Sequence, residues 1–307
     1  MDMFRKFSIV VAALSILWGS AAAESQQVLL DRAKSLLEHG RYADARHEYM
    51  RLKLDSKAAN EDIVQQVEYG LTVCAVRLDD NIAEQRMKSF LTRYPGSVHS
   101  ADVRFLLALH YCETEQWATA KEEFEKVPYK SLTTADRERY DVRMGYIAFL
   151  SGKYGDALAF FNRVERGGAA YDHALYYTSY IHYQQGDIER AYKGFAALKN
   201  SEIYSGLIPF YLLQLEFDRG NYKYVVDNCD ALLSKAADSE RSSILRLAAE
   251  AWFRLEGYSR ALAYITTYAK EAGGKMSRED NYLLGYTTYR TADYAGAVAP
   301  LKAVCTG

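Results

Sequence analysis

The sequence predicts an all-α protein built from about eight helical hairpins, and three observations support this. Only four prolines interrupt its 307 residues, so long stretches are free to be helical. Apolar residues recur at helical spacing on both sides of short turns. A small residue returns at intervals of 34 to 38 residues along the chain, and such a period fits two helices and two turns.

The repeated unit is a turn of the Gly-x-Tyr kind, then a small residue, then an apolar residue four positions later. We call the small residue of each copy its anchor. The eight anchors are Ala45, Ala83, Ala120, Ala157, Ala191, Val225, Ala261 and Ala297. In the fourth copy, apolar stripes lie in Tyr140–Leu150 before the turn and in Tyr154–Val164 after it. One hairpin cannot bury both stripes, so we expect neighbouring hairpins to stack.

This pattern resembles that of the tetratricopeptide repeat (TPR) family over about residues 26 to 304. Gly145, Ser179 and Gly285 match the small position of the family's first helix, and aromatic residues such as Tyr154 match its turn position. The resemblance implies a right-handed α-solenoid over residues 24–307.

Two copies depart from the family pattern. The sixth has Val225 with Cys229 in place of the usual pair, and the second has Asp80 where the aromatic belongs. The second copy nevertheless ends in Tyr94-Pro95, which resembles the inter-repeat turn of bacterial cell-envelope TPR proteins.

The resemblance also implies a concave inner wall made by the first helix of each hairpin. Its exposed positions lie 15, 11 and 8 residues before the anchor, a spacing that places them on one helix face. In the third to eighth copies most residues at these positions are aromatic. Tyrosine suits a surface that is exposed to water when free and buried when a partner is bound. The predicted partner-binding groove is formed by Phe105, Tyr146, Phe149, His173, Tyr176, Tyr180, Tyr183, Phe210, Phe217, Tyr282, Tyr286 and Tyr289.

Two alternatives stay open for these residues. The rings can pack against the next hairpin instead of facing a ligand. His173 shares the inner face with Tyr176 and Tyr180; it could donate to a peptide carboxylate, or it could be a solvated surface histidine.

Residues 1–23 are predicted to be a secretory signal peptide. Arg5 and Lys6 precede an apolar run from Phe7 to Trp18, and small residues follow at Ala21–Ala23. The alternative is an uncleaved anchor, but this run is shorter than the roughly 20 residues that span a bilayer. No cysteine near the cut allows lipid attachment, so we expect a periplasmic or secreted protein.

Composition restricts the partners. The net formal charge of −2 provides no basic footprint for nucleic acid or anionic lipid. The four cysteines, Cys74, Cys112, Cys229 and Cys305, form no CxxC pair. We expect them to be small buried residues of amphipathic helices, although an export compartment would permit disulfides.

No catalytic motif accompanies the repeats. HExxH, GxSxG, GxGxxG and a phosphate-binding loop are all absent, and the six histidines are dispersed. We therefore expect no enzyme activity, no cofactor and no metal site.

The last hairpin is expected to leave Leu301 and Val304 in water and to be disturbed by Pro300. This predicts a C-terminal continuation of the array or a partner at that end.

The sequence thus predicts an exported scaffold that binds protein or peptide segments of the cell envelope in an aromatic groove. Two alternatives remain: a regulatory or targeting arm of a larger enzyme or envelope complex, and a module that binds glycan or peptidoglycan.

Overall fold

The computed structural model describes residues 25–55, 60–167, 170–273 and 275–306. The predicted signal peptide, residues 1–23, lies outside them. The described residues form sixteen α-helices and one 3-10 turn, η2 (Tyr129–Ser131), and no strand. The helices are α2 (Gln26–Glu38), α3 (Tyr42–Asp55), α4 (Glu61–Arg77), α5 (Ala83–Arg93), α6 (Ser100–Glu113), α7 (Trp117–Glu125), α8 (Thr134–Leu150), α9 (Tyr154–Phe161), α10 (Tyr171–Gln184), α11 (Ile188–Ala197), α12 (Ile208–Asp218), α13 (Tyr222–Leu233), α14 (Asp238–Arg254), α15 (Tyr258–Glu271), α16 (Arg278–Arg290) and α17 (Tyr294–Thr306).

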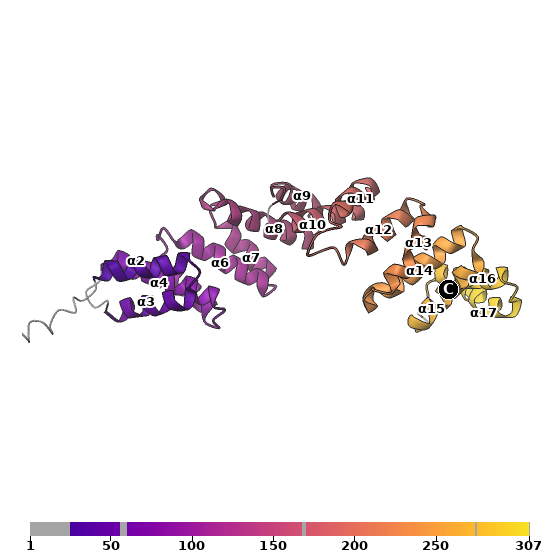
Figure 1. The fold of residues 1–307 in the computed structure, drawn as a ribbon, viewed down its shortest axis with the longest axis horizontal. Coiled ribbons are helices and arrows are strands. Elements are labelled where there is room, and N and C mark those ends of the chain that lie inside the picture. Colours follow the sequence, from indigo (N-terminus) through magenta and orange to yellow (C-terminus); the bar gives the residue numbers. More distant parts are fainter. Residues whose placement is uncertain (1–24, 56–59, 168–169, 274, 307) are drawn as a thin grey trace, which may run out of the picture. The chain divides into compact units, whose positions relative to one another are not determined.

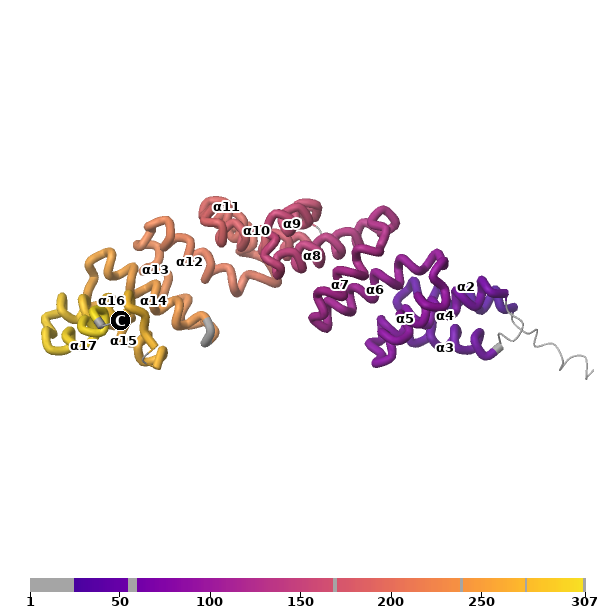
Figure 2. Tube along the Cα trace, turned by 180° about the vertical axis from the view of Figure 1, so that it is seen from behind, coloured from indigo at the N-terminus to yellow at the C-terminus, as the bar shows by residue number. Residues whose placement is uncertain are grey.

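The helices pair in chain order into eight hairpins, α2 with α3 through α16 with α17, as the prediction required (Figures 1 and 2). The chain divides into two compact units. Unit 1 comprises residues 1–143 and contains α2 to α7 with the first part of α8; unit 2 comprises residues 144–307 and contains the rest.

Each hairpin turns through one residue in the left-handed backbone region, with φ between 53° and 78°. The next N–H then bonds a carbonyl five residues back, as from Gly257 to Trp252 at 2.8 Å, which caps the first helix. Only half of the turn residues are glycine, the type that reaches this region without strain. The eight are Gly40, Asp79, Glu115, Gly152, Gly186, Gly220, Glu256 and Ala292.

The anchors lie where the second helix of each hairpin meets the first, and none is more than 5 % exposed. The residue four positions further on completes the contact. In the fourth hairpin a β-carbon added to Gly145 would lie 2.5 Å from the Phe161 ring, so only glycine permits this approach. In six hairpins the second helix begins at the predicted turn aromatic, for example Tyr154 in α9.

Each unit has its own apolar interior. In unit 1 a cluster including Leu30, Tyr49 and Leu71 joins α2, α3 and α4. In unit 2 a cluster including Val225 and Cys229 joins α12, α13 and α14. The irregular sixth copy therefore fills its interior with β-branched and sulfur-containing side chains.

Two sequence expectations need correction at the C-terminal end. Cys74, Cys112 and Cys229 are buried as expected, but Cys305 is exposed. The helix α17 continues through Pro300 to Thr306, and Leu301 and Val304 are partly covered. Leu301 packs closely on Gly285 of α16, and this contact holds α17 in place beyond the proline.

No helix in the described part of the chain is both long enough and apolar enough to cross a bilayer.

The turn geometry predicts that Ala292→Gly stabilises the α16–α17 hairpin. Glycine removes the cost of a β-carbon at φ 68°, a gain of about 1 kcal/mol after its own entropy cost. Hydrogen exchange of the α16 and α17 amides measures it. The matched control is Ala295→Gly, an exposed position inside α17, which should lose about 0.5 to 1 kcal/mol. Equal changes in the stability of the α16–α17 hairpin in both variants would contradict the prediction.

Candidate functional site

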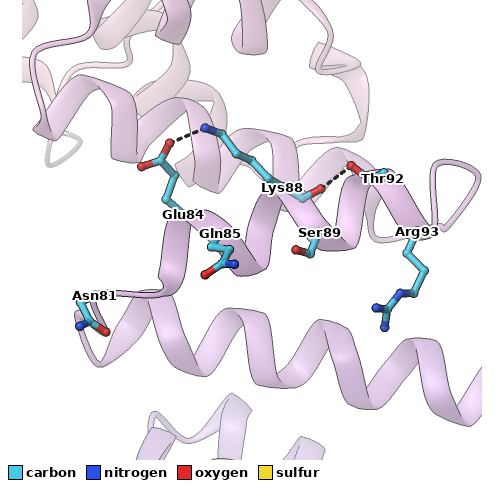
Figure 3. A pocket seen from close by; sticks show the side chains of 7 residues that line it. All are labelled: Asn81, Glu84, Gln85, Lys88, Ser89, Thr92 and Arg93. Atoms are coloured by element: carbon cyan, nitrogen blue, oxygen red, sulfur yellow. Dashed lines mark hydrogen bonds and ion pairs between the residues drawn. The ribbon is translucent and has the colours of Figure 1, made fainter.

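Hollows lie on both units. In unit 1 a shallow polar hollow of about 780 Å³ runs along α5, where Lys88 pairs with Glu84 at 2.6 Å (Figure 3). In unit 2 a pocket of about 450 Å³ lies between α14 and α16. The second hollow is at the predicted inner face, because Phe253 and Tyr282 occupy predicted inner positions. It is therefore the candidate site.

We call this hollow the α14–α16 pocket. Apolar side chains and charged side chains of both signs line it together. The lining residues are Arg246, Glu250, Phe253, Arg254, Arg278, Glu279, Asp280, Tyr282, Leu283 and Val304.

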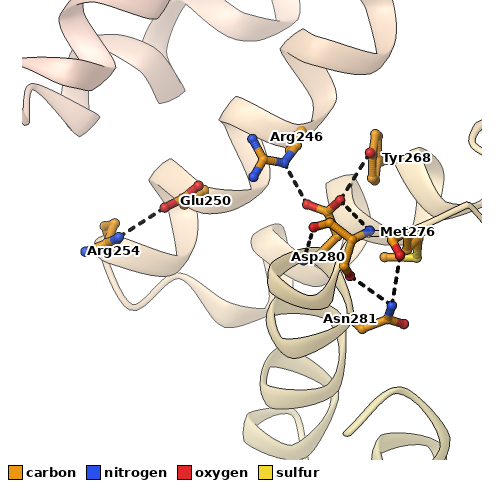
Figure 4. Close-up of polar contacts among 8 residues, drawn as sticks. Arg246, Glu250, Arg254, Tyr268, Met276, Asp280 and Asn281 are labelled. Carbon is orange, nitrogen blue, oxygen red and sulfur yellow. Dashed lines mark hydrogen bonds and ion pairs between the residues drawn. The ribbon is translucent and has the colours of Figure 1, made fainter. Parts of the chain in front are cut away.

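A buried carboxylate fixes one wall of the pocket. Asp280 accepts from Arg246 Nε at 2.6 Å and from the Tyr268 hydroxyl at 3.2 Å (Figure 4). It also accepts from the backbone N–H of Ser277 at 3.1 Å, while the Ser277 hydroxyl accepts from the backbone N–H of Asp280 at 3.1 Å. This capping box starts α16 and ties it to α14 and α15 at the same point.

Electrostatics keep Asp280 ionised. Burial alone would raise the pKa of its carboxyl, but hydrogen bonds from Arg246 and Ser277 outweigh burial and hold that pKa below its ordinary value. The pKa of Arg246 is raised by the same hydrogen bond. A permanent ion pair therefore orients Arg246 along the pocket.

The remaining charges differ in how they are engaged. Arg254 bonds Glu250 at 3.0 Å, one turn apart on α14 (Figure 4). Arg278 is exposed at the start of α16 and forms no ion pair with any described residue. Among the arginines that line the pocket, Arg278 is thus the one without an ion pair to a described residue, and it lies beside apolar lining from Phe253 and Leu283.

A row of tyrosines follows the same face of α16 away from the pocket. We call Tyr282, Tyr286 and Tyr289 the tyrosine row. Neighbouring ring centroids lie 5.7 and 6.4 Å apart, and Tyr282 and Tyr289 are 46 % and 51 % exposed. The guanidinium of Arg290 lies 4.0 Å above the Tyr258 ring and donates to the hydroxyls of Tyr258 and Tyr286. These contacts hold Tyr286, the middle ring of the row.

Solved structures with similar helical hairpins include PilF of Pseudomonas aeruginosa, at 15 % identity and a TM-score of 0.50 over 66 % of this chain and 89 % of that one. A tetratricopeptide repeat protein from Parabacteroides merdae follows at 12 % identity and a TM-score of 0.47, over 87 % of this chain and all of that one. MamA from Desulfovibrio magneticus gives 15 % identity and a TM-score of 0.48, over 55 % and 94 %. No protein-family profile and no curated protein matches the sequence.

The fold is that of a tetratricopeptide repeat protein. At these identities the likeness concerns the fold alone, and the TPR assignment agrees with the eight anchors and eight left-handed turns described above.

The TPR hairpins in the middle of unit 2 use their predicted groove residues differently. Tyr176 stacks on Tyr204 with centroids 4.4 Å apart, and its hydroxyl bonds that of Tyr211 at 2.9 Å. Tyr180 meets the Tyr211 ring edge-on, and Phe149 meets the Tyr180 ring. These rings are half-buried against the next hairpin, so here packing accounts for the aromatic face.

The other predicted residues of this region are also partly covered. Tyr146 and Phe149 both contact Tyr177. Phe210 packs against Tyr211, and Phe217 against Tyr222.

Burial of these tyrosines changes the pKa of their hydroxyl groups. It raises the pKa of Tyr183 to about 12, with a further contribution from Asp218, and it also raises the pKa of Tyr176.

His173 lies in a packed environment and not on a fully solvated surface. Its Nδ1 lies 2.8 Å from the Tyr204 hydroxyl, and its ring is partly buried edge-on to Tyr204. The imidazole therefore helps to hold the segment between α11 and α12, and Nδ1 is already engaged.

Phe105 was predicted to line the partner-binding groove, and this prediction is wrong. It is only 3 % exposed, edge-on to Phe124 of α7, and the Arg139 guanidinium lies over its ring. The neighbouring inner positions Leu109 and Cys112 are buried as well. In unit 1 this face of α6 is interior, because the second helix and the following helix both cover it.

Several residues of the site were missed from sequence. Tyr204 lies in a connection between helices, where the repeat register assigns no role. Tyr177 and Tyr211 each follow an inner position by one residue, and this adjacency was the available signal. Asp280 had no pattern of its own.

The described residues contain no group of three or more His, Cys, Asp or Glu side chains placed to hold a metal ion. What the α14–α16 pocket and the tyrosine row can do chemically is to bury apolar side chains and to pair a charge.

Replacing Asp280 by Asn should destabilise α16 and the pocket wall. The change leaves Arg246 without its carboxylate, and we expect a loss of about 1 to 3 kcal/mol. Chemical unfolding of the variant measures it, with Glu279→Gln, an exposed neighbour in the same turn, as the control within about 0.5 kcal/mol.

The pH dependence of this loss has a defined sign. The folded-state pKa of Asp280 lies below the unfolded value of about 3.9. Its stabilisation is therefore complete above that pH and disappears as pH falls through the folded pKa. The difference in free energy of unfolding between the native protein and Asp280→Asn should decrease in acid. A difference that stays constant with pH would contradict the assignment.

Proposed function

We propose that this protein is an exported TPR scaffold that binds segments of other cell-envelope proteins on the first-helix face of unit 2. The observation that supports the proposal best is the combination of the α14–α16 pocket with the exposed tyrosine row. Both lie on α16, at positions that TPR register assigns to the inner face.

The chemistry of the tyrosine row suits protein binding. Tyr282 and Tyr289 present large rigid rings at small entropic cost, and their hydroxyls keep them soluble when no partner is bound. The pocket beside Tyr282 is large enough for one or two apolar side chains. Arg278 at its edge can pair with a carboxylate of the incoming segment.

Contrast within unit 2 supports the choice of α16. In α10, Tyr176 stacks on Tyr204, and both Tyr176 and Tyr180 meet the Tyr211 ring edge-on, which leaves little ring surface for a partner. In α16, Phe253 and Tyr258 contact only the middle ring, Tyr286, and Tyr282 and Tyr289 are exposed.

Export and an envelope location are supported by sequence features alone. They are the basic and apolar character of residues 1–23 and the turn at Tyr94-Pro95.

The binding proposal predicts loss of a partner when the row is truncated. A photo-activatable amino acid at Tyr286 in intact cells should capture a protein, and Tyr282→Ala with Tyr289→Ala should reduce that capture by about tenfold. Tyr282→Phe with Tyr289→Phe keeps the rings and should retain most of it. The same probe at Lys223, an exposed second-helix position in α13, is the background control.

Two results would contradict the binding proposal. The first is capture that survives both alanine changes. The second is a protein that captures no partner but is retained on peptidoglycan sacculi, where the alanine changes abolish this retention. That result would favour a glycan site.

Export predicts a shorter mature chain outside the cytoplasm. Cell fractionation followed by mass spectrometry should find a chain that begins near residue 24 in the periplasm or medium. Charged residues introduced into the run from Phe7 to Trp18 should retain the full-length chain in the cytoplasm. A full-length chain in the cytoplasm of unmodified cells would refute export while leaving the binding proposal standing.

A further inference from the structure

A continuous groove runs along the second-helix side of unit 1. Three hollows of about 430, 250 and 780 Å³ form it. The first two share Ile82 and Arg86, and the second and third share Gln85, Ser89 and Arg93. Shared lining residues make the three hollows one surface feature, which we call the α3–α5 groove.

Two helices form its walls and a third its floor. Ala43, Arg46, Met50 and Lys53 line it from α3, and Ile82 with residues of α5 lines the other side. Helix α4 lies beneath, with Leu71, Thr72 and Glu68 at the bottom. The side chains of Gln85, Ser89 and Arg93 recur at four-residue spacing along α5 (Figure 3).

An apolar stripe follows the α3 side of the groove. Ala43, Met50 and Leu54 are exposed at helical spacing, and Ile82 is exposed opposite Met50 across the shared hollow. Large apolar side chains in water beside a groove mark a binding surface.

The rim of the groove is basic. Its lining contains five Lys or Arg and three Asp or Glu side chains. The acids lie deeper than the bases that pair with them: Lys53 bonds Glu68 at 2.6 Å, and the two side chains are 43 % and 15 % exposed. The same order holds for Arg46 with Asp80 and for Lys88 with Glu84.

Arg93 adds a further positive charge. It is exposed at the end of α5 and forms no ion pair with any residue that the structure describes. The groove therefore presents cationic groups to solvent, although the whole chain carries a net charge of −2.

We propose that the α3–α5 groove binds an amphipathic α-helix with acidic flanks, supplied by a partner protein. A helix laid between α3 and α5 would place apolar side chains on Met50 and Ile82, and acidic side chains against Arg46, Arg86 and Arg93. The α3 wall from Ala43 to Lys53 is about 15 Å long, which is close to three turns of helix.

The exposed apolar stripe argues against a nucleic acid as the partner. Its phosphates would pair with the Lys and Arg side chains but would leave Met50, Leu54 and Ile82 uncovered. This surface lies on the second-helix side of unit 1. It is independent of the tyrosine row, which lies on the first-helix side of unit 2.

The test uses the purified full chain and a fluorescent peptide of about 14 residues, kept helical by a side-chain lactam. One face of the peptide is Leu and the other Glu, and a second peptide carries Lys in place of every Glu. The acidic peptide should bind with a Kd on the order of 10 µM. The basic peptide should bind at least about tenfold more weakly, and added salt should weaken the acidic complex.

Variants locate the binding. Arg93→Glu with Met50→Glu should weaken binding of the acidic peptide by about tenfold. Because both side chains are exposed, circular dichroism should show an unchanged fold. Lys223→Glu in α13 reverses an equally exposed lysine of unit 2 and should have no effect. Tyr282→Ala with Tyr289→Ala should also have no effect, which separates this proposal from the binding proposed for unit 2.

Three outcomes would overturn it: no saturable binding of the acidic peptide, equal binding of the basic peptide, or full binding by the Arg93→Glu, Met50→Glu variant. If the acidic peptide failed to bind and the chain instead sedimented with phosphatidylglycerol vesicles, the groove would be assigned to binding a lipid surface. That assignment requires that the same variant lose the sedimentation.

Discussion

The close approach of the two helices at each anchor is the contact on which the other features depend. A small residue with almost no exposure lets the second helix lie against the first, and the apolar residue four positions later fills the space beside it. Gly145 against Phe161 shows how little room is left. Since neither helix can bury its stripe alone, the geometry of one hairpin determines which faces its neighbours cover and which remain for partners.

The fold could be predicted from sequence because it repeats. A period of 34 to 38 residues specifies helix pairs, and the anchors fall in the interior in all eight copies. The left-handed turns at Asp79, Glu115, Glu256 and Ala292 show that position in the hairpin, rather than residue type, determines the turn. Tertiary packing holds these residues in a conformation that their own propensity disfavours.

The exposure of the inner face could not be predicted in the same way. Register places Tyr176 and Tyr282 at equivalent positions, yet the first is stacked on Tyr204 and the second is exposed. The difference comes from the segment between α11 and α12, whose course no periodicity specifies. Phe105 was misjudged for a different reason, since Phe124 of α7 and Arg139 of α8 cover it.

Polar contacts between hairpins recur at about one repeat length. Arg46 reaches Asp80 and Arg246 reaches Asp280, each 34 residues away, and the Tyr176 and Tyr211 hydroxyls are 35 residues apart. Each such link joins a hairpin only to the next one along the chain. Under mechanical tension, a hairpin that unfolds would remove the support of its neighbours but no distant contact, so extension should proceed in steps of single hairpins.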